Sequence, residues 1–127
     1  MRLRLTTLAL GCALLGSCIT PSIPIPPPDP SQIDGTITGD GEERVVSFTY
    51  PPTNNYVGTT VYIYDRSKGH GIIEDAHSDG SVGPTAPVRA DLGDEIVFSF
   101  ARDDRTVSTC IKLREGAQSS VDYCGGD

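Results

Sequence analysis

Short runs in which apolar and polar side chains alternate constrain this chain more than any other feature. The clear runs span residues 44–50, 59–65, 95–102 and 106–113, and weaker ones span 33–38, 72–76, 87–92 and 119–123. Alternation of this kind is typical of β-strands with one buried face, and no stretch of ten residues shows a helical period. The pattern therefore predicts an all-β fold of seven or eight short strands, packed as a single antiparallel β-sandwich.

The composition agrees with many short strands joined by turns, because the 127 residues include 14 Gly and 10 Pro but no Trp. A proline-rich interruption early in the chain divides it into three parts. We expect a targeting leader over residues 1–17, a tether over 18–31 and one domain over 32–127. A domain of that length is large enough to fold around one core.

The leader has the layout of a signal peptide. Arg2 and Arg4 precede an uncharged apolar run over residues 5–15, and Gly16 and Ser17 follow it. Basic residues hold the amino end on the cytoplasmic side, and the apolar run is too short to span a bilayer as a stable helix. The sequence therefore predicts export and cleavage of the leader, in preference to a transmembrane anchor.

The segment Leu15-Gly16-Ser17-Cys18 resembles the lipobox of bacterial lipoproteins, in which an aliphatic and two small residues precede an acylated cysteine. The resemblance implies lipid on the Cys18 thiol, cleavage after Ser17 and acylation of the freed amine. A competing site at Cys12 would leave a shorter apolar run. Two or three acyl chains give permanent membrane anchoring. Thr20 stands where some such lipoproteins carry a retaining Asp, so the resemblance favours the outer membrane, with either face possible.

The tether over residues 18–31 is dense in proline, which forbids helix and internal sheet. Polyproline II is its expected conformation, and it would hold the domain roughly 30 Å from the lipid as a semi-rigid spacer. A second interpretation is a ligand for an aromatic groove, because Pro24 and Pro27 have the spacing of such ligands.

The middle of the domain resembles bacterial immunoglobulin-like and fibronectin-type-III-like repeats over about residues 57–113. The run 60–65 is followed by an Asp79-Gly80 turn, and a Gly93-Asp94 corner leads into the hydrophobic run 96–100. The resemblance implies an immunoglobulin-like sandwich that serves adhesion, scaffolding or spacing and has no shared active site. A fold of this kind does not by itself supply a function.

Two cysteines, Cys110 and Cys124, remain after the leader and the lipid site are assigned. An even pair in an exported domain predicts a disulfide, and a loop of this size would contribute about 3 kcal/mol in the chain-entropy model. A metal or redox role would need a CxxC spacing or nearby histidines.

Three further groups are candidates for binding chemistry. The segment 75–80 has alternating oxygen ligands like a calcium loop but lacks the Glu that an EF-hand needs, so a solvated turn is favoured. His70 and His77, with Asp75 or Asp79, would make a surface zinc site if they met across a hairpin. The loop 54–56 with Tyr62 and Tyr64 is a candidate binding patch, and packing of these tyrosines on the sheet is the alternative.

The charge narrows the choice of partners. Loss of the two leader arginines leaves eight basic residues against 17 acidic ones, a net charge of −9, which repels nucleic acid. No GxSxG motif or spare cysteine marks a nucleophile. We therefore expect a noncatalytic envelope module, without a cofactor, that binds protein or glycan or scaffolds an assembly, with its oligomeric state open. The alternative is a small metal-binding or hydrolytic protein.

Overall fold

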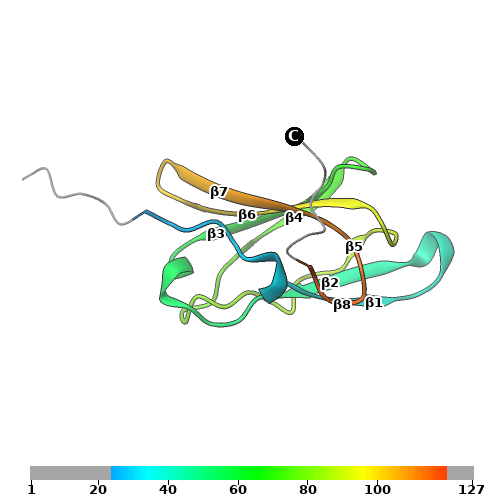
Figure 1. The fold of residues 1–127 in the computed structure, drawn as a ribbon, viewed down its shortest axis with the longest axis horizontal. Coiled ribbons are helices and arrows are strands. Elements are labelled where there is room, and N and C mark those ends of the chain that lie inside the picture. The colour runs from blue at the N-terminus through cyan, green and yellow to red at the C-terminus, as the bar shows by residue number, and fades with distance from the viewer. Residues whose placement is uncertain (1–23, 120–127) are drawn as a thin grey trace, which may run out of the picture.

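The structure is a computed structural model that describes residues 24–119, and it confirms an all-β sandwich (Figure 1). The strands are β1 (Asp34–Thr38), β2 (Val45–Thr49), β3 (Thr60–Asp65), β4 (His70–Asp75), β5 (Val88–Arg89), β6 (Glu95–Arg102), β7 (Arg105–Lys112) and β8 (Gly116–Ala117). Three single 3-10 turns, η1 (Pro30–Gln32), η2 (Gly41–Glu43) and η3 (Asn54–Tyr56), account for the helical residues in the described part of the chain.

The eight strands form two antiparallel sheets of four. One sheet has the order β5-β2-β1-β8 and the other has the order β4-β3-β6-β7. Figure 1 shows the two sheets as layers, with the hairpin of β6 and β7 at the same end as η3. The turns between β1 and β2 and between β3 and β4 lie at the opposite end.

The core forms where the inward sides of the two sheets meet, as the alternation predicts. Apart from the half-buried Thr109, the residues predicted to face inward in the four clear runs are buried or packed against the core: Val46, Phe48, Tyr50, Val61, Ile63, Ile96, Phe98, Phe100, Val107, Ile111 and Leu113. Aromatic rings join the layers, since Phe48 meets Phe98 edge to face with centroids 5.8 Å apart. Edge-to-face pairs of this kind stabilise cores beyond the area that they bury.

The sequence pattern does not predict the last described strand, β8. The weak run at 119–123 predicts a strand, but β8 lies at Gly116–Ala117, where it pairs with Asp34 and Gly35 of β1; residues 120–123 lie outside the described part. This strand is held by backbone pairing and carries no alternating side chains, so periodicity cannot locate it.

The boundary between tether and domain also differs from the expectation. Ile25, Pro28 and Pro30 are buried, and Ile25 belongs to the hydrophobic core. Residues 25–30, which we call the proline strap, therefore pack on the sandwich and do not act as a free spacer. The domain begins near residue 25 and not at residue 32.

Several predicted features lie outside the described residues, namely the leader, Cys12, Cys18 and Cys124. Between residues 24 and 119, no helix has the length and apolar character needed to cross a membrane.

Candidate functional site

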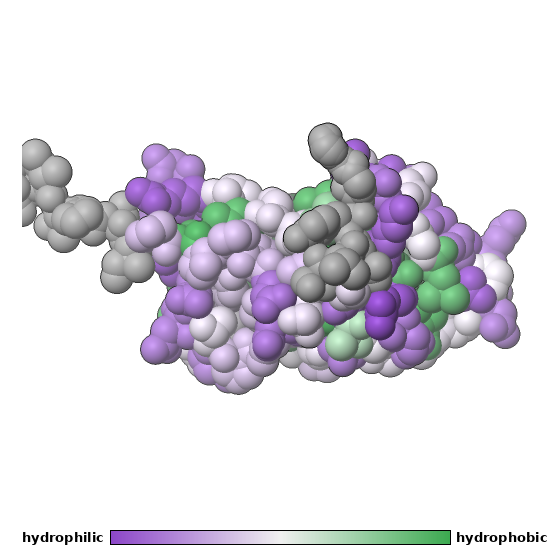
Figure 2. All heavy atoms as spheres, in the orientation of Figure 1, coloured by the Kyte–Doolittle hydropathy of each residue, from purple (hydrophilic) through white to green (hydrophobic). Residues whose placement is uncertain are grey.

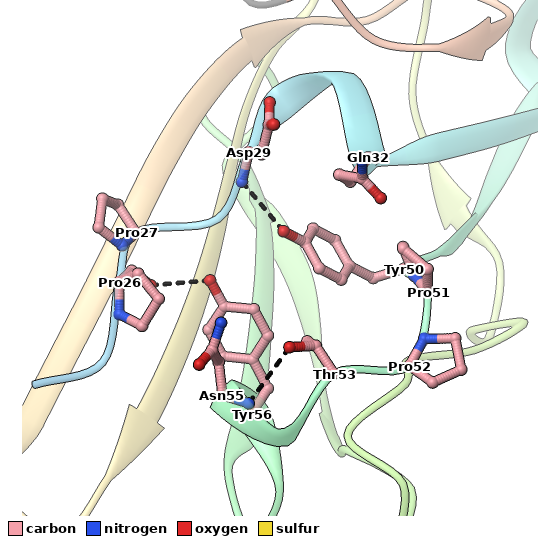
Figure 3. A pocket seen from close by; sticks show the side chains of 10 residues that line it. All are labelled: Pro26, Pro27, Asp29, Gln32, Tyr50, Pro51, Pro52, Thr53, Asn55 and Tyr56. Atoms are coloured by element: carbon pink, nitrogen blue, oxygen red, sulfur yellow. Dashed lines mark hydrogen bonds between the residues drawn. The ribbon is translucent and has the colours of Figure 1, made fainter. Parts of the chain in front are cut away.

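The proline strap is fastened to the sandwich by two tyrosines (Figure 3). The Tyr56 hydroxyl donates to the carbonyl of Pro26 at 2.7 Å, and the amide of Asp29 donates to the Tyr50 oxygen at 3.1 Å. The two tyrosine rings meet edge to face, and their hydroxyls also interact. One end of the strap is thus bound to each tyrosine, so the strap has a fixed path.

The position of Tyr56 follows from its turn. Thr53 caps η3 by accepting from the amide of Asn55, and the Tyr56 ring then stacks on Phe100 with centroids 3.7 Å apart. The pKa of Tyr56 is far above its ordinary value. Burial is the main cause, and the charge and hydrogen bond of Tyr50 are smaller causes. The Tyr56 phenol therefore stays protonated and remains a donor to the strap.

A pocket of about 390 Å³ lies between the strap and the loop that joins β2 to β3. Its walls are two pairs of prolines, four polar side chains and the two tyrosines: Pro26, Pro27, Asp29, Gln32, Tyr50, Pro51, Pro52, Thr53, Asn55 and Tyr56. The aromatic faces of Tyr50 and Tyr56 are buried, so they are closed to a stacking ligand. The pocket therefore lies where the strap packs on the sandwich, and it is not a site for stacking a ligand on these tyrosines.

This arrangement changes two predictions about binding. Within the chain, the proline-rich segment is bound to two tyrosines through Pro26 and Asp29, while docking of Pro24 and Pro27 in the groove of another protein stays a prediction. The candidate patch of the loop 54–56 with Tyr62 and Tyr64 does not exist as one surface, because Tyr56 is buried in the core. Tyr50 and Tyr56 were missed as strap residues, although the nearby Pro51-Pro52 pair marks an unusual loop.

Tyr62 and Tyr64 do form an exposed surface with their neighbours on β4. Tyr62 is 40% exposed, Tyr64 is 44% exposed and Ile73 is 66% exposed. Tyr62 pairs with Ile73 and Tyr64 pairs with Gly71, so these four residues share the outward side of the sheet. We call Tyr62, Tyr64, Gly71 and Ile73 the tyrosine face.

The tyrosine face has both a projection and a hollow. A shallow pocket of about 240 Å³ lies at the β3–β4 pairing, lined by Tyr62, Ile63, Tyr64, Gly71, Ile72 and Ile73. Gly71 lies against the backbone of β3, where a Cβ would meet the Ile63 carbonyl, and it adds no side chain to this pocket, whereas Ile73 projects beside Tyr62. By contrast, Figure 2 shows a side of the molecule that is largely polar, with apolar residues in small separate areas.

Next to the tyrosine face, β6 and β7 present small polar side chains. Ser99 lies beside Tyr62, and its hydroxyl meets that of Ser108 at 2.6 Å. Tyrosine is enriched in protein interfaces, because it offers large contact area at low entropic cost.

The structure does not bring His70 and His77 together. They lie at opposite ends of β4, with the His70 Nε2 atom 2.9 Å from the carbonyl of Arg89 and the His77 Nε2 atom 2.9 Å from that of Gly83. Among residues 24–119, no group of three or more His, Cys, Asp or Glu side chains is placed to hold a metal ion. The predicted zinc arrangement of His70, His77 and a carboxylate is therefore not formed.

The segment 75–80 ends in the predicted Asp-Gly turn. Asp79 accepts from both the amide and the hydroxyl of Ser81, and these bonds hold the pKa of Asp79 below its usual value. Gly80 has φ of 83°, and a Cβ there would meet the Thr53 carbonyl. The turn thereby supports the loop that carries Thr53 and η3.

Cys110 lies on β7, opposite Val97, on the outward side of the sheet. Its sulfur is 3.8 Å from an Arg66 guanidinium nitrogen. Its predicted partner Cys124 lies beyond the described residues, so the bridge between the two stays a prediction.

The end of the sandwich opposite η3 holds a cluster of charges around Lys68. The Lys68 ammonium lies 2.8 Å from Asp91 and 2.9 Å from Asp94. Asp65 is buried beside them and accepts from the amide of Lys68, while burial and a hydrogen bond with Asp94 raise the pKa of Asp65 to about 6. The carboxyl pair of Asp65 and Asp94 therefore holds a proton under mildly acidic conditions.

Comparisons of the chain with models of known protein families, with curated proteins and with solved structures find no match. The residues and their geometry are therefore the basis of the functional proposal.

Proposed function

We propose that this protein is a lipid-anchored, noncatalytic binding or scaffolding module of the cell envelope, and that the tyrosine face is its contact surface. The observation that carries the proposal is the exposure of Tyr62, Tyr64 and Ile73 together on one outward side of a sheet. Exposed apolar and aromatic side chains that gather in one place mark interaction sites on soluble domains.

An immunoglobulin-like sandwich forms part of this proposal. Lettering β1, β2 and β5 as strands A, B and E, and β3, β6 and β7 as C, F and G, puts A, B and E in one sheet and C, F and G in the other. Immunoglobulin-type sandwiches divide these strands between their sheets in the same way. Sandwiches of this kind commonly present a sheet face or end loops to a partner.

The anchor part of the proposal rests on the lipobox-like segment that ends at Cys18, and Thr20 favours the outer membrane. Because the proline strap packs on the sandwich from Ile25 onward, the chain from Cys18 to Ile25 reaches about 25 Å at most. We propose that the domain stays closer to the lipid than a free proline-rich tether would hold it. Its partner would then be another envelope protein or a glycan at the membrane surface.

Metabolic labelling with a fatty acid tests the anchor. We expect the full chain to take up label and to fractionate with membranes, and the Cys18→Ala variant to lose both properties. A Cys12→Ala variant is the matched control, and it should keep the label. A Cys18→Ala protein that stayed in the membrane fraction would overturn the anchor.

Photo-crosslinking in intact cells tests the contact surface. A photoreactive residue in place of Tyr64 should capture an envelope protein or glycan, whereas the same residue in place of Leu92 should not. Leu92 is a fair control because it is also exposed, at 57%, but lies in the turn before β6. Equal capture from both positions, or from neither, would contradict the proposal.

A further inference from the structure

We propose that the tyrosine face binds a second copy of this chain, the two faces packing with their β3 and β4 strands antiparallel. This inference rests on the proposed function in one respect, that the tyrosine face is the contact surface, and it names the partner. Both the shape and the charges of the face are complementary to those of a second copy related by a half-turn.

The shape is complementary to itself. The pair Ile63 and Ile72 lies at the centre of the face, with Tyr62 and Ile73 to one side and Tyr64 and Gly71 to the other. We place a two-fold axis in the plane between the two faces, so that it passes over this centre and runs perpendicular to the strands. This axis places Ile73 of one copy over Gly71 of the other. The projecting Ile73 side chain then enters the hollow beside Tyr64, and the contact occurs twice, as in any isologous interface.

The charges are complementary under the same half-turn. Arg66 and Asp75 lie equally far from the central pair, toward opposite ends of the face. Both are exposed. The Arg66 side chain is 52% exposed to solvent, although a Glu95 carboxylate oxygen lies 3.8 Å from its guanidinium group. The axis brings Arg66 of each copy over the paired residues Thr60 and Asp75 of the other, within reach of the Asp75 carboxylate. Copies related by an axis parallel to the strands would instead place like charges together, which is unfavourable.

The middle of the face also suits contact between two acidic molecules. The side chains of Tyr62, Tyr64, Val97, Ser99 and Ser108 include no Asp or Glu, so the acidic residues behind the net charge of −9 on the mature chain lie elsewhere. Packed sheets lie about 10 Å apart, a separation that side chains as long as Arg66 can bridge. Confinement of both copies to one membrane would raise their effective concentration.

Sedimentation equilibrium of the acylated full chain in detergent tests the proposal with charge reversals. We expect the wild type to dimerise, and Arg66→Glu or Asp75→Arg to raise the dissociation constant about tenfold, because each reversal replaces two attractions by two repulsions. An equimolar mixture of the two variants should dimerise as the wild type does, since both ion pairs re-form between unlike copies. Rescue by mixing shows that each variant is folded.

The apolar contact has its own test. Ile73→Asp should abolish dimerisation, while Leu92→Asp, an equally drastic change at another exposed position, should leave it unchanged. A wild type that sediments as a monomer at every concentration would overturn the proposal, as would an Ile73→Asp dimer or a mixture without rescue. If the chain is monomeric but a photoreactive residue at Tyr64 captures another envelope component, the proposed function stands and only this inference fails.

Discussion

The Tyr56 ring stacks on Phe100 with the two planes only 6° apart, while the hydroxyl of the same side chain donates to the Pro26 carbonyl. One residue thus joins the core of the sandwich to the proline strap. Because the strap leads toward the cysteine that we propose as the lipid site, this contact determines where the anchored end of the chain leaves the domain.

Truncation of Ile25 tests whether the strap belongs to the domain. Ile25→Ala should lower the free energy of unfolding by about 2 kcal/mol or more, because it removes a buried aliphatic side chain from the core. Denaturant unfolding of the full chain measures the change. Pro24→Ala, at an exposed position directly before the strap, should have little effect. Equal stabilities for wild type and Ile25→Ala would mean that the strap is a free tether.

Removal of the Tyr56 hydroxyl separates its two roles. Tyr56→Phe keeps the stack on Phe100 but leaves the Pro26 carbonyl without its donor, so we expect a loss of about 1 kcal/mol in unfolding free energy. Hydrogen exchange should also become faster at the Asp29 amide, which bonds to the neighbouring Tyr50. Tyr64→Phe is the control, since its ring lies on the exposed face. Unchanged exchange at Asp29 in the Tyr56→Phe variant would contradict a coupled attachment.

The raised pKa of Asp65 predicts how the stability of the protein depends on pH. Burial and the hydrogen bond to Asp94 raise its pKa to about 6 in the folded state, above the ordinary value of 3.8 that we expect when unfolded. The folded state therefore binds more protons between these values, and the contribution of Asp65 to stability falls as pH rises through this range. Above about pH 6 the folded protein holds a buried, ionised carboxylate, and the loss is complete.

Asp65→Asn isolates that contribution. The amide can donate to Asp94 and its oxygen can still accept from the Lys68 amide, so the variant imitates protonated Asp65 at every pH. We expect the variant to be more stable than the wild type at pH 8 and to lose this advantage near pH 4. Unfolding free energies measured across this range check the difference, with the exposed Asp75→Asn as control. A constant difference between Asp65→Asn and wild type would contradict the raised pKa.

The predicted disulfide between Cys110 and Cys124 is tested by removing one partner. Cys124→Ser should lower the unfolding free energy by about 3 kcal/mol, since the bridge limits the unfolded chain. The wild type in reductant should match the variant, and thiol titration of the denatured, unreduced wild type should detect neither cysteine. A wild type with two titratable thiols in oxidising conditions would show that the bridge does not form.

The sequence by itself determined the strands and their inward faces, because alternation with a period of two is a local property that burial of one face requires. Val46 and Phe48, or Phe98 and Phe100, could be assigned to the core before any partner strand was known. The same alternation placed Tyr62 and Tyr64 on the opposite side of their strand from Val61 and Ile63. It left open whether these tyrosines are exposed or packed on the sheet. The Asp79-Gly80 turn likewise followed from local chemistry.

Only the tertiary structure decided which of these elements meet. The attachment of Pro26 to Tyr56 joins residues 30 positions apart, and the pairing of Gly35 with Gly116 joins backbone groups that carry no side-chain signal. The separation of His70 from His77 and the hollow at Gly71 depend on the register between β3 and β4. Such contacts depend on the path of the chain through space, because a residue pattern records which face is buried and not what covers it.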